Sequence, residues 1–218
     1  MADYKKPDHW QLKARNEGYP ARSVYKLKEM DEKFGLLKPG RSNPSFRVLD
    51  LGAAPGSWSL YVLRYAASGL GANANVFLVS ADIAPLSRQY DRGLFGGGNF
   101  NFIQGDITEP AVRDSILSLG PYNLIISDVA PATTGNRFID TTPSLELAEA
   151  VVSYAGNTLA ANGSLVVKLF QGGDSVQLLT QMKTMFKSAK SYKPQACRGE
   201  SFETYYLGTM YNKKGVTL

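Results

Sequence analysis

Five short apolar segments alternate with stretches of helical pattern, and this alternation limits the chain to one class of fold. The segments are rich in Val, Ile, Leu and Phe and are bounded by Gly, Pro, Asn or Asp; they span residues 47–51, 75–80, 100–104, 122–127 and 164–170. Helices are predicted at 57–68, after Pro85, at 109–119, at 145–159, and at 175–187 with Asp174 as the N-cap. Such alternation predicts an open, doubly wound α/β sheet of mostly parallel strands.

Both ends of the chain depart from this alternation. The apolar residues of 21–35 recur on one helical face and the pattern stops at Gly35, which predicts a helix ahead of the first strand. Lys26 lies beside that apolar stripe rather than within it. Near the C-terminus, residues 189–196 and 203–211 follow each other without room for a full helix, so we expect the sheet to finish with an antiparallel pair.

Composition excludes several classes of protein. At 218 residues and 44% hydrophobic, the chain can bury one substantial core, so one domain is expected. Cys197 is the single cysteine and His9 the single histidine, so we expect neither a disulfide framework nor a metal site. The N-terminus has no apolar signal-like region and no run approaches eighteen apolar residues. A cytoplasmic protein without membrane contact is therefore expected.

Charge is distributed unevenly along the chain. Residues 1–41 carry ten Lys/Arg against six Asp/Glu, residues 42–182 seven against eleven, and residues 183–218 seven against two. The balances are +4, −4 and +5, which sum to the net +5. Two basic ends that meet would form a cationic surface suited to a phosphate backbone, although scattered solvated lysines would give the same totals. The residues expected to contribute at the N-terminal end are Lys5, Lys6 and Lys13.

The turn after the first predicted strand, in "VLDLGAAPGSWS", is rich in glycine and small residues. Such a turn lets a ligand approach the backbone, and the amides that open the next helix favour an anionic group. The pattern predicts a nucleotide-like cofactor, the alternative being a tight turn without a ligand. The stretch lacks the G-x-G-x-x-G fingerprint, which counts against a nicotinamide or flavin enzyme.

Three aspartates follow successive predicted strands. Asp82 closes the second strand, Asp106 follows the third and Asp128 ends the fourth. Any one of them would more often cap a loop, but all three should lie at the carboxyl edge of the sheet, where open α/β folds bind ligands. A carboxylate after the second strand can accept from both ribose hydroxyls, and one after the third from an adenine amino group.

These residues lie in motifs that resemble a known family. "LDLGAAPGSWS", "FIQGDI", "SDVAPATTG", "VVKLFQGG" and "ESFETYYLGT" are similar to the FtsJ/RrmJ family of S-adenosylmethionine-dependent RNA 2′-O-ribose methyltransferases, and the likeness runs from "GYPARSVYKL" to "ETYYLGT". The resemblance implies a Rossmann-like, mostly parallel seven-stranded methyltransferase sheet with an antiparallel last strand. It further implies one domain over 1–218, made of a basic helical extension at 1–41 and a catalytic core at 42–218.

The resemblance also implies a cofactor and its contacts. S-adenosylmethionine would bind without metal and leave as S-adenosylhomocysteine, with Asp82 on the ribose, Asp106 on the adenine and Asp128 between cofactor and chemistry. The residues expected to shape the pocket around the methionine part are Gly52, Gly56 and Trp58. Two features depart from the family pattern: Ser57 stands where many relatives have a second glycine, and a Gly-rich insertion occupies 91–100.

Lys168 is out of place in the apolar strand "SLVVKLF", and the family pattern accounts for it. The K-D-K-E tetrad of the family falls on Lys26, Asp128, Lys168 and Glu203. A ribose 2′-hydroxyl is a poor nucleophile and needs its proton removed late or during attack. Lys168 is then expected as the base, or as the cation that stabilises the alkoxide, with Asp128 and Glu203 positioning it and Lys26 orienting the ribose or a phosphate. From the strand alone, the alternative is a side chain on an edge strand that reaches to solvent.

The basic ends of the chain and the stretch "PARSVYKL" favour RNA as the substrate. Arg22, Tyr25 and Lys28 offer charge with an aromatic ring, although Tyr25 could equally belong to the core. Within the family, a compact chain with a short basic extension is most similar to bacterial members that methylate a uridine of 23S ribosomal RNA in the large ribosomal subunit. We expect this chain to be a monomer. Alternatives are a family member acting on the tRNA anticodon loop, a non-catalytic RNA-binding ribosome assembly factor, or a small-molecule methyltransferase.

Overall fold

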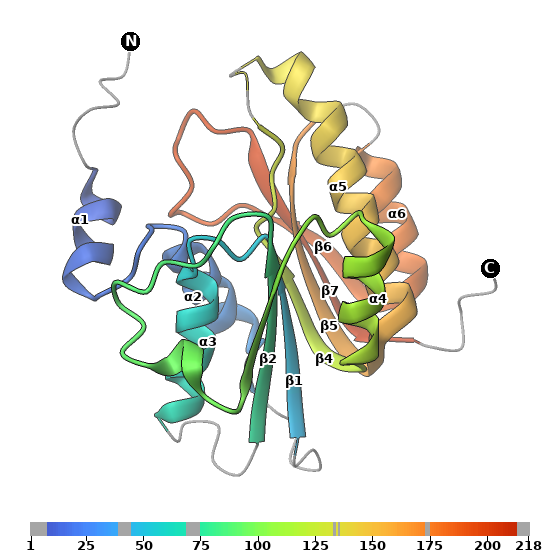
Figure 1. Cartoon of the computed structure of the whole chain (residues 1–218). Helices are drawn as coiled ribbons and strands as arrows, with labels where there is room; N and C mark the ends of the chain where they lie inside the picture. Colours follow the sequence, from blue (N-terminus) through green and yellow to red (C-terminus); the bar gives the residue numbers. More distant parts are fainter. Residues whose placement is uncertain are drawn as a thin grey trace.

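A single twisted sheet organises the computed structural model, which describes residues 8–38, 45–68, 75–132, 134, 136–172 and 175–212 (Figure 1). Within the described residues the sheet has seven strands: β1 Ser45–Leu51, β2 Asn75–Asp82, β3 Phe100–Gln104, β4 Tyr122–Ser127, β5 Leu159–Phe170, β6 Phe186–Tyr192 and β7 Glu203–Tyr211. They lie in the order β3-β2-β1-β4-β5-β7-β6. The first five strands are parallel, and β7 is antiparallel to both β5 and β6. The predicted mostly parallel, doubly wound sheet with an antiparallel end is confirmed.

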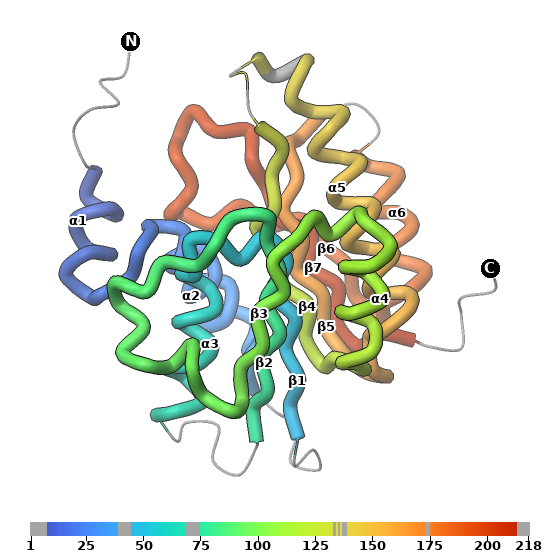
Figure 2. Tube along the Cα trace, viewed as in Figure 1, coloured from blue at the N-terminus to red at the C-terminus, as the bar shows by residue number. Residues whose placement is uncertain are grey.

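Helices cover both faces of this sheet. The described helices are α1 His9–Asn16, α2 Val24–Phe34, α3 Ser57–Ala67, the 3-10 turn η1 Leu94–Gly96, α4 Pro110–Ser118, α5 Arg137–Thr158 and α6 Ser175–Met185. Figure 2 shows α1, α2 and α3 on one side of the sheet and α4, α5 and α6 on the other. None of the helices in the described part of the chain is long and apolar enough to cross a membrane.

Alternate residues of the central strands feed two hydrophobic cores. Val48 and Leu124 pair across β1 and β4 and pack with α2 and α3, whereas Leu49 and Ile125, one position further along, pack with α4, α5 and α6. Because both faces are covered, the strands can be apolar at nearly every position. This is why continuous apolar runs marked the strands in the sequence.

The structure corrects one predicted helix. The stretch after Pro85 is irregular, and its only helical turn in the described structure is the short η1. Gly93, with φ 84°, and the glycines that follow favour turns over a helix. Phe95 of this stretch is buried and stacks on Phe100 at 4.9 Å between ring centroids. The Gly-rich insertion therefore folds back onto the α3 face of the sheet.

Other boundaries differ in smaller ways. Helix α5 begins at Arg137, eight residues before the predicted 145, and includes Pro143 in its second turn, where proline has no N–H to donate to the carbonyl of Ile139. Strand β5 begins at Leu159 rather than 164. Helix α1 was not predicted separately, and it begins at a capping box formed by Asp8 and Gln11. The predicted N-cap Asp174 lies outside the described residues.

The N-terminal segment, including α2, contacts the end of β6 and the residues that follow it. Glu29 of α2 accepts hydrogen bonds from the Tyr192 hydroxyl and the Gln195 amide, and Arg22 donates to the carbonyl of Ala196. Helix α2 ends at Gly35 as predicted, with φ 65°. The two basic segments of the sequence, 1–41 and 183–218, thus meet in the described structure on one side of the molecule.

Candidate active site

The turn after β1 passes very close to the turn after β4. Gly52 has φ 76°, and a Cβ atom added there would lie 2.6 Å from Cα of Val129. The amides of Gly52 and Ala53 donate to the carbonyl of Ala81 at the end of β2. Any side chain at Gly52 would separate the turns, so glycine is required for the carboxyl ends of β1, β2 and β4 to form one wall.

A cavity of about 380 Å³ opens at these carboxyl ends. It has the size of a small-molecule site and mixes carboxylates with apolar surface. Four of the predicted cofactor residues line it, namely Gly52, Asp82, Asp106 and Asp128. The remaining lining is Ala54, Ile83, Gly105, Ile107, Val129, Ala130, Pro131, Ala132 and Leu147.

The two outer carboxylates of the cavity also fix the loops around them. Asp82 accepts hydrogen bonds from the amides of Ala54 and Ala84, at 2.9 and 2.8 Å. Asp106 accepts from the amide and hydroxyl of Thr108, and these bonds lower the pKa of its carboxyl. Both aspartates therefore cap loops and line the cavity at the same time.

Gly56 and Trp58, the other two predicted cofactor residues, do not line this cavity. Gly56 has φ 106°, and a Cβ there would lie 2.9 Å from the ring of Phe95. Trp58 is buried, and its indole N–H donates to the carbonyl of Ser23 at 2.8 Å. Ser57, the departure from the family pattern, exchanges two hydrogen bonds with the backbone of Ala21. These three residues join α3 to its neighbours.

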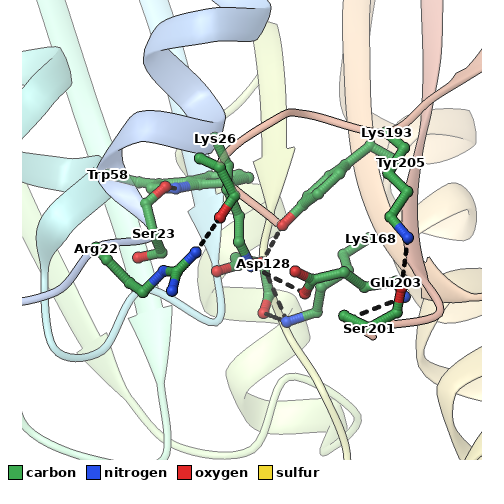
Figure 3. Close-up of polar contacts among 11 residues, drawn as sticks. Arg22, Ser23, Lys26, Trp58, Asp128, Lys168, Lys193, Ser201, Glu203 and Tyr205 are labelled. Carbon is green, nitrogen blue, oxygen red and sulfur yellow. Dashed lines mark hydrogen bonds and ion pairs between the residues drawn. The ribbon is translucent and has the colours of Figure 1, made fainter. Parts of the chain in front are cut away.

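The four tetrad residues come together beside the cavity (Figure 3). The Lys168 ammonium lies 3.1 Å from Oδ1 of Asp128 and donates to the backbone carbonyl of the same residue. The Lys26 ammonium lies 2.8 Å from Oε2 of Glu203. Lys168 and Glu203 stand on the antiparallel neighbours β5 and β7, Asp128 follows β4, and Lys26 comes from α2. Two ion pairs therefore lie at one edge of the sheet.

Tyr205 belongs to this cluster, and sequence reasoning did not select it. Its hydroxyl donates to Oδ1 of Asp128 at 2.6 Å, and its ring packs against Trp58 with 5.9 Å between centroids. It pairs with Lys168 across the β5–β7 ladder. The sequence could have indicated Tyr205, because it lies two residues after Glu203 in a predicted strand and therefore faces the same side of β7.

The charges of the cluster reinforce one another. Burial raises the pKa of the Asp128 carboxyl, but the ammonium groups of Lys168 and Lys26 outweigh burial and hold that pKa below its ordinary value. Burial lowers the pKa of the Lys26 amine, but Asp128 and Glu203 outweigh it and raise that pKa. Burial and the two carboxylates raise the pKa of the Tyr205 phenol well above its ordinary value. Asp128 and Lys26 are therefore charged, and Tyr205 is neutral, near pH 7.

The cavity fits a cationic nucleoside better than a phosphate ligand. Asp82, Asp106 and Asp128 would repel a pyrophosphate, but they can accept from hydroxyl, amino and ammonium groups. The close approach at Gly52 leaves backbone, rather than a side chain, beside the ligand. No cluster of His, Cys, Asp and Glu able to hold a metal occurs among the described residues.

Comparisons with known proteins agree with this geometry. The model of the FtsJ-like methyltransferase family matches residues 19–211. The chain is 47% identical to ribosomal RNA large subunit methyltransferase E of Treponema denticola, with 94% of this chain and 95% of that protein covered. It is 42% identical to the protein of the same name from Borrelia garinii subsp. bavariensis, covering 96% of this chain and all of the other.

Solved structures show the same fold. A crystal structure described as a ribosomal RNA methyltransferase from Plasmodium falciparum matches with TM-score 0.70 and 25% identity, covering 88% of this chain and 98% of that one. Human methyltransferase-like protein 13, solved with S-adenosylhomocysteine, matches with TM-score 0.56 and 15% identity, covering 88% and 85%, a likeness of fold alone. With a family model that spans most of the chain and relatives similar over their full length, the chain belongs to the FtsJ-like methyltransferase family.

Proposed function

We propose that this enzyme transfers a methyl group from S-adenosylmethionine to a ribose 2′-hydroxyl of RNA, with 23S ribosomal RNA of the large subunit as its substrate. The observation that carries the proposal is the position of Lys168. Its ammonium is held by Asp128, and Asp128 is also part of the wall of the cavity at the sheet edge. A group that handles a proton therefore lies next to the site where a methyl donor would bind.

The cofactor, when bound, supplies the methyl group as an electrophile on a sulfonium. We assign the cofactor ribose to Asp82 and the adenine to Asp106, which line the same cavity after the neighbouring strands β2 and β3. Asp128, which follows β4, carries the negative charge that holds Lys168 in place. The residues of the chain must also align the ribose 2′-oxygen with the bond between the methyl group and sulfur, and must accept or stabilise the loss of the hydroxyl proton.

Lys168 is the residue that we assign to the reacting hydroxyl. As a neutral amine it would accept the proton, and as an ammonium it would donate to the developing alkoxide. Lys26 is the second cation, and its bond to Glu203 fixes the ammonium 2.8 Å from that carboxylate. We assign Lys26 to the ribose or the adjacent phosphate. Glu203 was predicted to position Lys168, but in the described structure it pairs with Lys26, so we assign it to positioning Lys26.

The choice of RNA rests on the relatives and on the surface. The two relatives named above carry the name of a ribosomal RNA large subunit enzyme and are similar over their whole length. This favours ribosomal RNA over the tRNA anticodon loop. The assembled tetrad favours an enzyme over a non-catalytic assembly factor. Organisation as one domain over 1–218, a monomeric state and a cytoplasmic location remain predictions.

The proposal is tested with large ribosomal subunits from cells that lack this enzyme. The purified chain and S-adenosylmethionine labelled in the methyl group are incubated with these subunits, with small subunits and with tRNA. We expect label only in large-subunit RNA, within a dinucleotide that resists alkaline hydrolysis because its 2′-oxygen is methylated. Label on a base, or in tRNA alone, would contradict the proposal, and Lys168→Ala serves as the inactive control.

A further inference from the structure

A second cavity lies on the other side of the tetrad. It has a volume of about 530 Å³ and is built by the segment that opens α2, by the loop between β6 and β7, and by the end of β5. Lys26 and Glu203 form part of its wall, whereas Asp128 lines the cofactor cavity described above. The two ion pairs therefore stand between two separate spaces.

This arrangement suits the geometry of the reaction. Methyl transfer needs the attacking oxygen on the far side of the methyl group from its leaving sulfur. A cofactor in one space and an acceptor in the other approach from opposite sides, so the attacking oxygen and the methyl group would meet beside Asp128 and Lys168. A volume of about 530 Å³ lies in the range that encloses small organic ligands, so one nucleotide can be accommodated.

Aromatic surface marks one wall of the second cavity. Phe202 is half-buried, and its ring meets that of Phe170 edge to face at 4.8 Å between centroids. Phe170 lies directly opposite Glu203 on the neighbouring strand and two positions after Lys168, so it faces the same side of the sheet. A base stacked on Phe202 would therefore bring its ribose toward the lysines.

Carboxylates line this cavity together with cations, so a nucleotide with one phosphate suits it better than a bare anion. Glu203 is bonded to Lys26, and Asp140 accepts from the amide and hydroxyl of Thr134. Arg22 pairs with Asp8 and donates to the carbonyl of Ala196, which fixes the β6–β7 loop. Arg198 and Glu200 stand on the exposed part of that loop.

Arg198 is the exposed cation on the described wall of this cavity, whereas Arg22 is half-buried and Lys26 is buried, so Arg198 is the one we assign to a phosphate at the rim. Burial and the neighbouring charge of Arg198 both lower the pKa of the Arg22 guanidinium, so the two cations lie within electrostatic reach. An anion beside Arg198 would relieve that repulsion. One phosphate, rather than several, is consistent with the carboxylates on the same wall.

Building on the proposed function, we propose that this cavity receives the acceptor nucleotide, unstacked from its strand, with its base against Phe202 and its flanking phosphate at Arg198. RNA-binding proteins commonly read unstacked bases on aromatic rings, and enzymes that modify nucleotides extrude them into pockets. The role given to both residues is positioning, because the chemistry stays with the tetrad.

The test compares four substitutions, Arg198→Glu, Phe202→Leu, Phe202→Tyr and the control Arg113→Glu on the exposed surface of α4. Steady-state methylation of large subunits that lack the modification gives KM and kcat. Calorimetry gives the Kd for S-adenosylhomocysteine, and thermal unfolding reports on folding. We expect Arg198→Glu to raise KM about tenfold or more and Phe202→Leu to lower kcat/KM about tenfold. Phe202→Tyr and Arg113→Glu should stay within about threefold of the parent.

The cofactor measurements separate positioning from a structural role. If Phe202→Leu weakens S-adenosylhomocysteine binding or lowers the unfolding temperature in proportion to its loss of activity, the stacking role is overturned. Arg198→Glu and Phe202→Leu enzymes that both keep the parental KM and kcat would overturn the whole proposal. Failure of the proposed function looks different, because then the parent chain itself would leave large-subunit RNA unmethylated.

Discussion

The Lys168 ammonium is held twice by one residue, through the side chain of Asp128 at 3.1 Å and through its backbone carbonyl. Lys168 is only 7% exposed, so this double contact offsets much of the cost of burying its charge. The backbone contact also depends on the turn after β4, which packs against Gly52. The reactive group and the wall of the cofactor cavity are therefore positioned by the same turn.

Substitution of Lys168 distinguishes a base from a cation. Lys168→Ala removes the group that we place at the reacting hydroxyl, so single-turnover methyl transfer should fall by at least about a hundredfold while RNA and cofactor still bind. Lys168→Arg keeps the charge, but a guanidinium does not release its proton near pH 7. An inactive arginine variant is expected if Lys168 acts as the base.

Two outcomes would revise this assignment. Substantial activity in Lys168→Arg would reject the base and leave electrostatic stabilisation of the alkoxide as its role. Single-turnover rates near those of the parent in Lys168→Ala, with folding and cofactor binding intact, would remove Lys168 from the chemistry altogether.

Asp82 should control cofactor affinity. Asp82→Ala removes the proposed ribose contacts and the bonds to the amides of Ala54 and Ala84, so S-adenosylhomocysteine should bind more weakly by about 1–3 kcal/mol. Asp82→Asn keeps one acceptor oxygen and should weaken binding less. Asp114→Ala, on exposed α4, is the matched control. Calorimetry that finds unchanged affinity in Asp82→Ala would remove this residue from the site.

Much of the fold could be predicted because burial on both faces leaves a strong sequence signal. The strands at 100–104 and 122–127 were predicted with the bounds that the structure has. The meeting of Asp128 with Lys168 followed from the family motif, and in the structure β4 and β5 are neighbours. These features depend on local pattern and on the usual order of strands in such sheets.

The remaining features depend on contacts between distant segments. Trp58 is turned toward Ser23 by a hydrogen bond across 35 residues, which no local pattern reveals. The Gly-rich insertion at 91–100 departs from the family pattern, and its Phe95 packs against Gly56, which follows a different strand. Ser57 stands where many relatives have a second glycine, and in the structure its hydroxyl bonds to the backbone of Ala21 in the N-terminal extension.

The basic surface of α1 and α2 should contribute to RNA binding. Lys5 and Lys6 lie outside the described residues, so the test uses Lys13, Lys28 and Lys33, which line one surface pocket with the aromatic rings of Trp10, Tyr25 and Tyr192. Changing the three lysines to glutamate should weaken association with large subunits. The slope of log K against log salt should become shallower by about 0.7–0.9 for each phosphate that the protein no longer neutralises.

Cofactor affinity should stay the same in that triple variant. Lys183 and Lys187, exposed at the end of α6 and the start of β6 and not part of that pocket, provide a control in which both are changed to glutamate. An unchanged salt slope in the triple variant would exclude this surface from the RNA footprint, as would an equal weakening in the control.

Asp50 should make stability depend on pH. It is fully buried in β1, where its Oδ2 accepts from the Ser59 hydroxyl at 2.7 Å and its Oδ1 has no hydrogen-bond partner among the described residues. Burial, opposed in part by Ser59, raises the pKa of this carboxyl to about 7, with Asp128 and Asp82 adding to the rise. The neutral form is therefore preferred in the folded state, whereas the unfolded chain releases the proton near pH 4.

Because the pKa of Asp50 is higher in the folded state than in the unfolded chain, this carboxyl makes the folded protein less stable as the pH rises. Stabilisation from the folded state's preference for the proton is fully present below about pH 4 and is lost as the pH rises to about 7. Asp50→Asn has no proton to lose, so its free energy of unfolding lacks this pH dependence. The free energy of unfolding of Asp50→Asn minus that of the parent should therefore increase as the pH rises from about 4 to about 7. The increase should be a few kcal/mol, on the order of 1.4 kcal/mol per pKa unit. Urea unfolding of both proteins at pH 5, 6, 7 and 8 measures this difference, in which the titration of the other carboxylates largely cancels. A difference that stays constant with pH would mean that Asp50 is ionised in the folded protein, with a hydrogen-bond donor such as an ordered water at Oδ1.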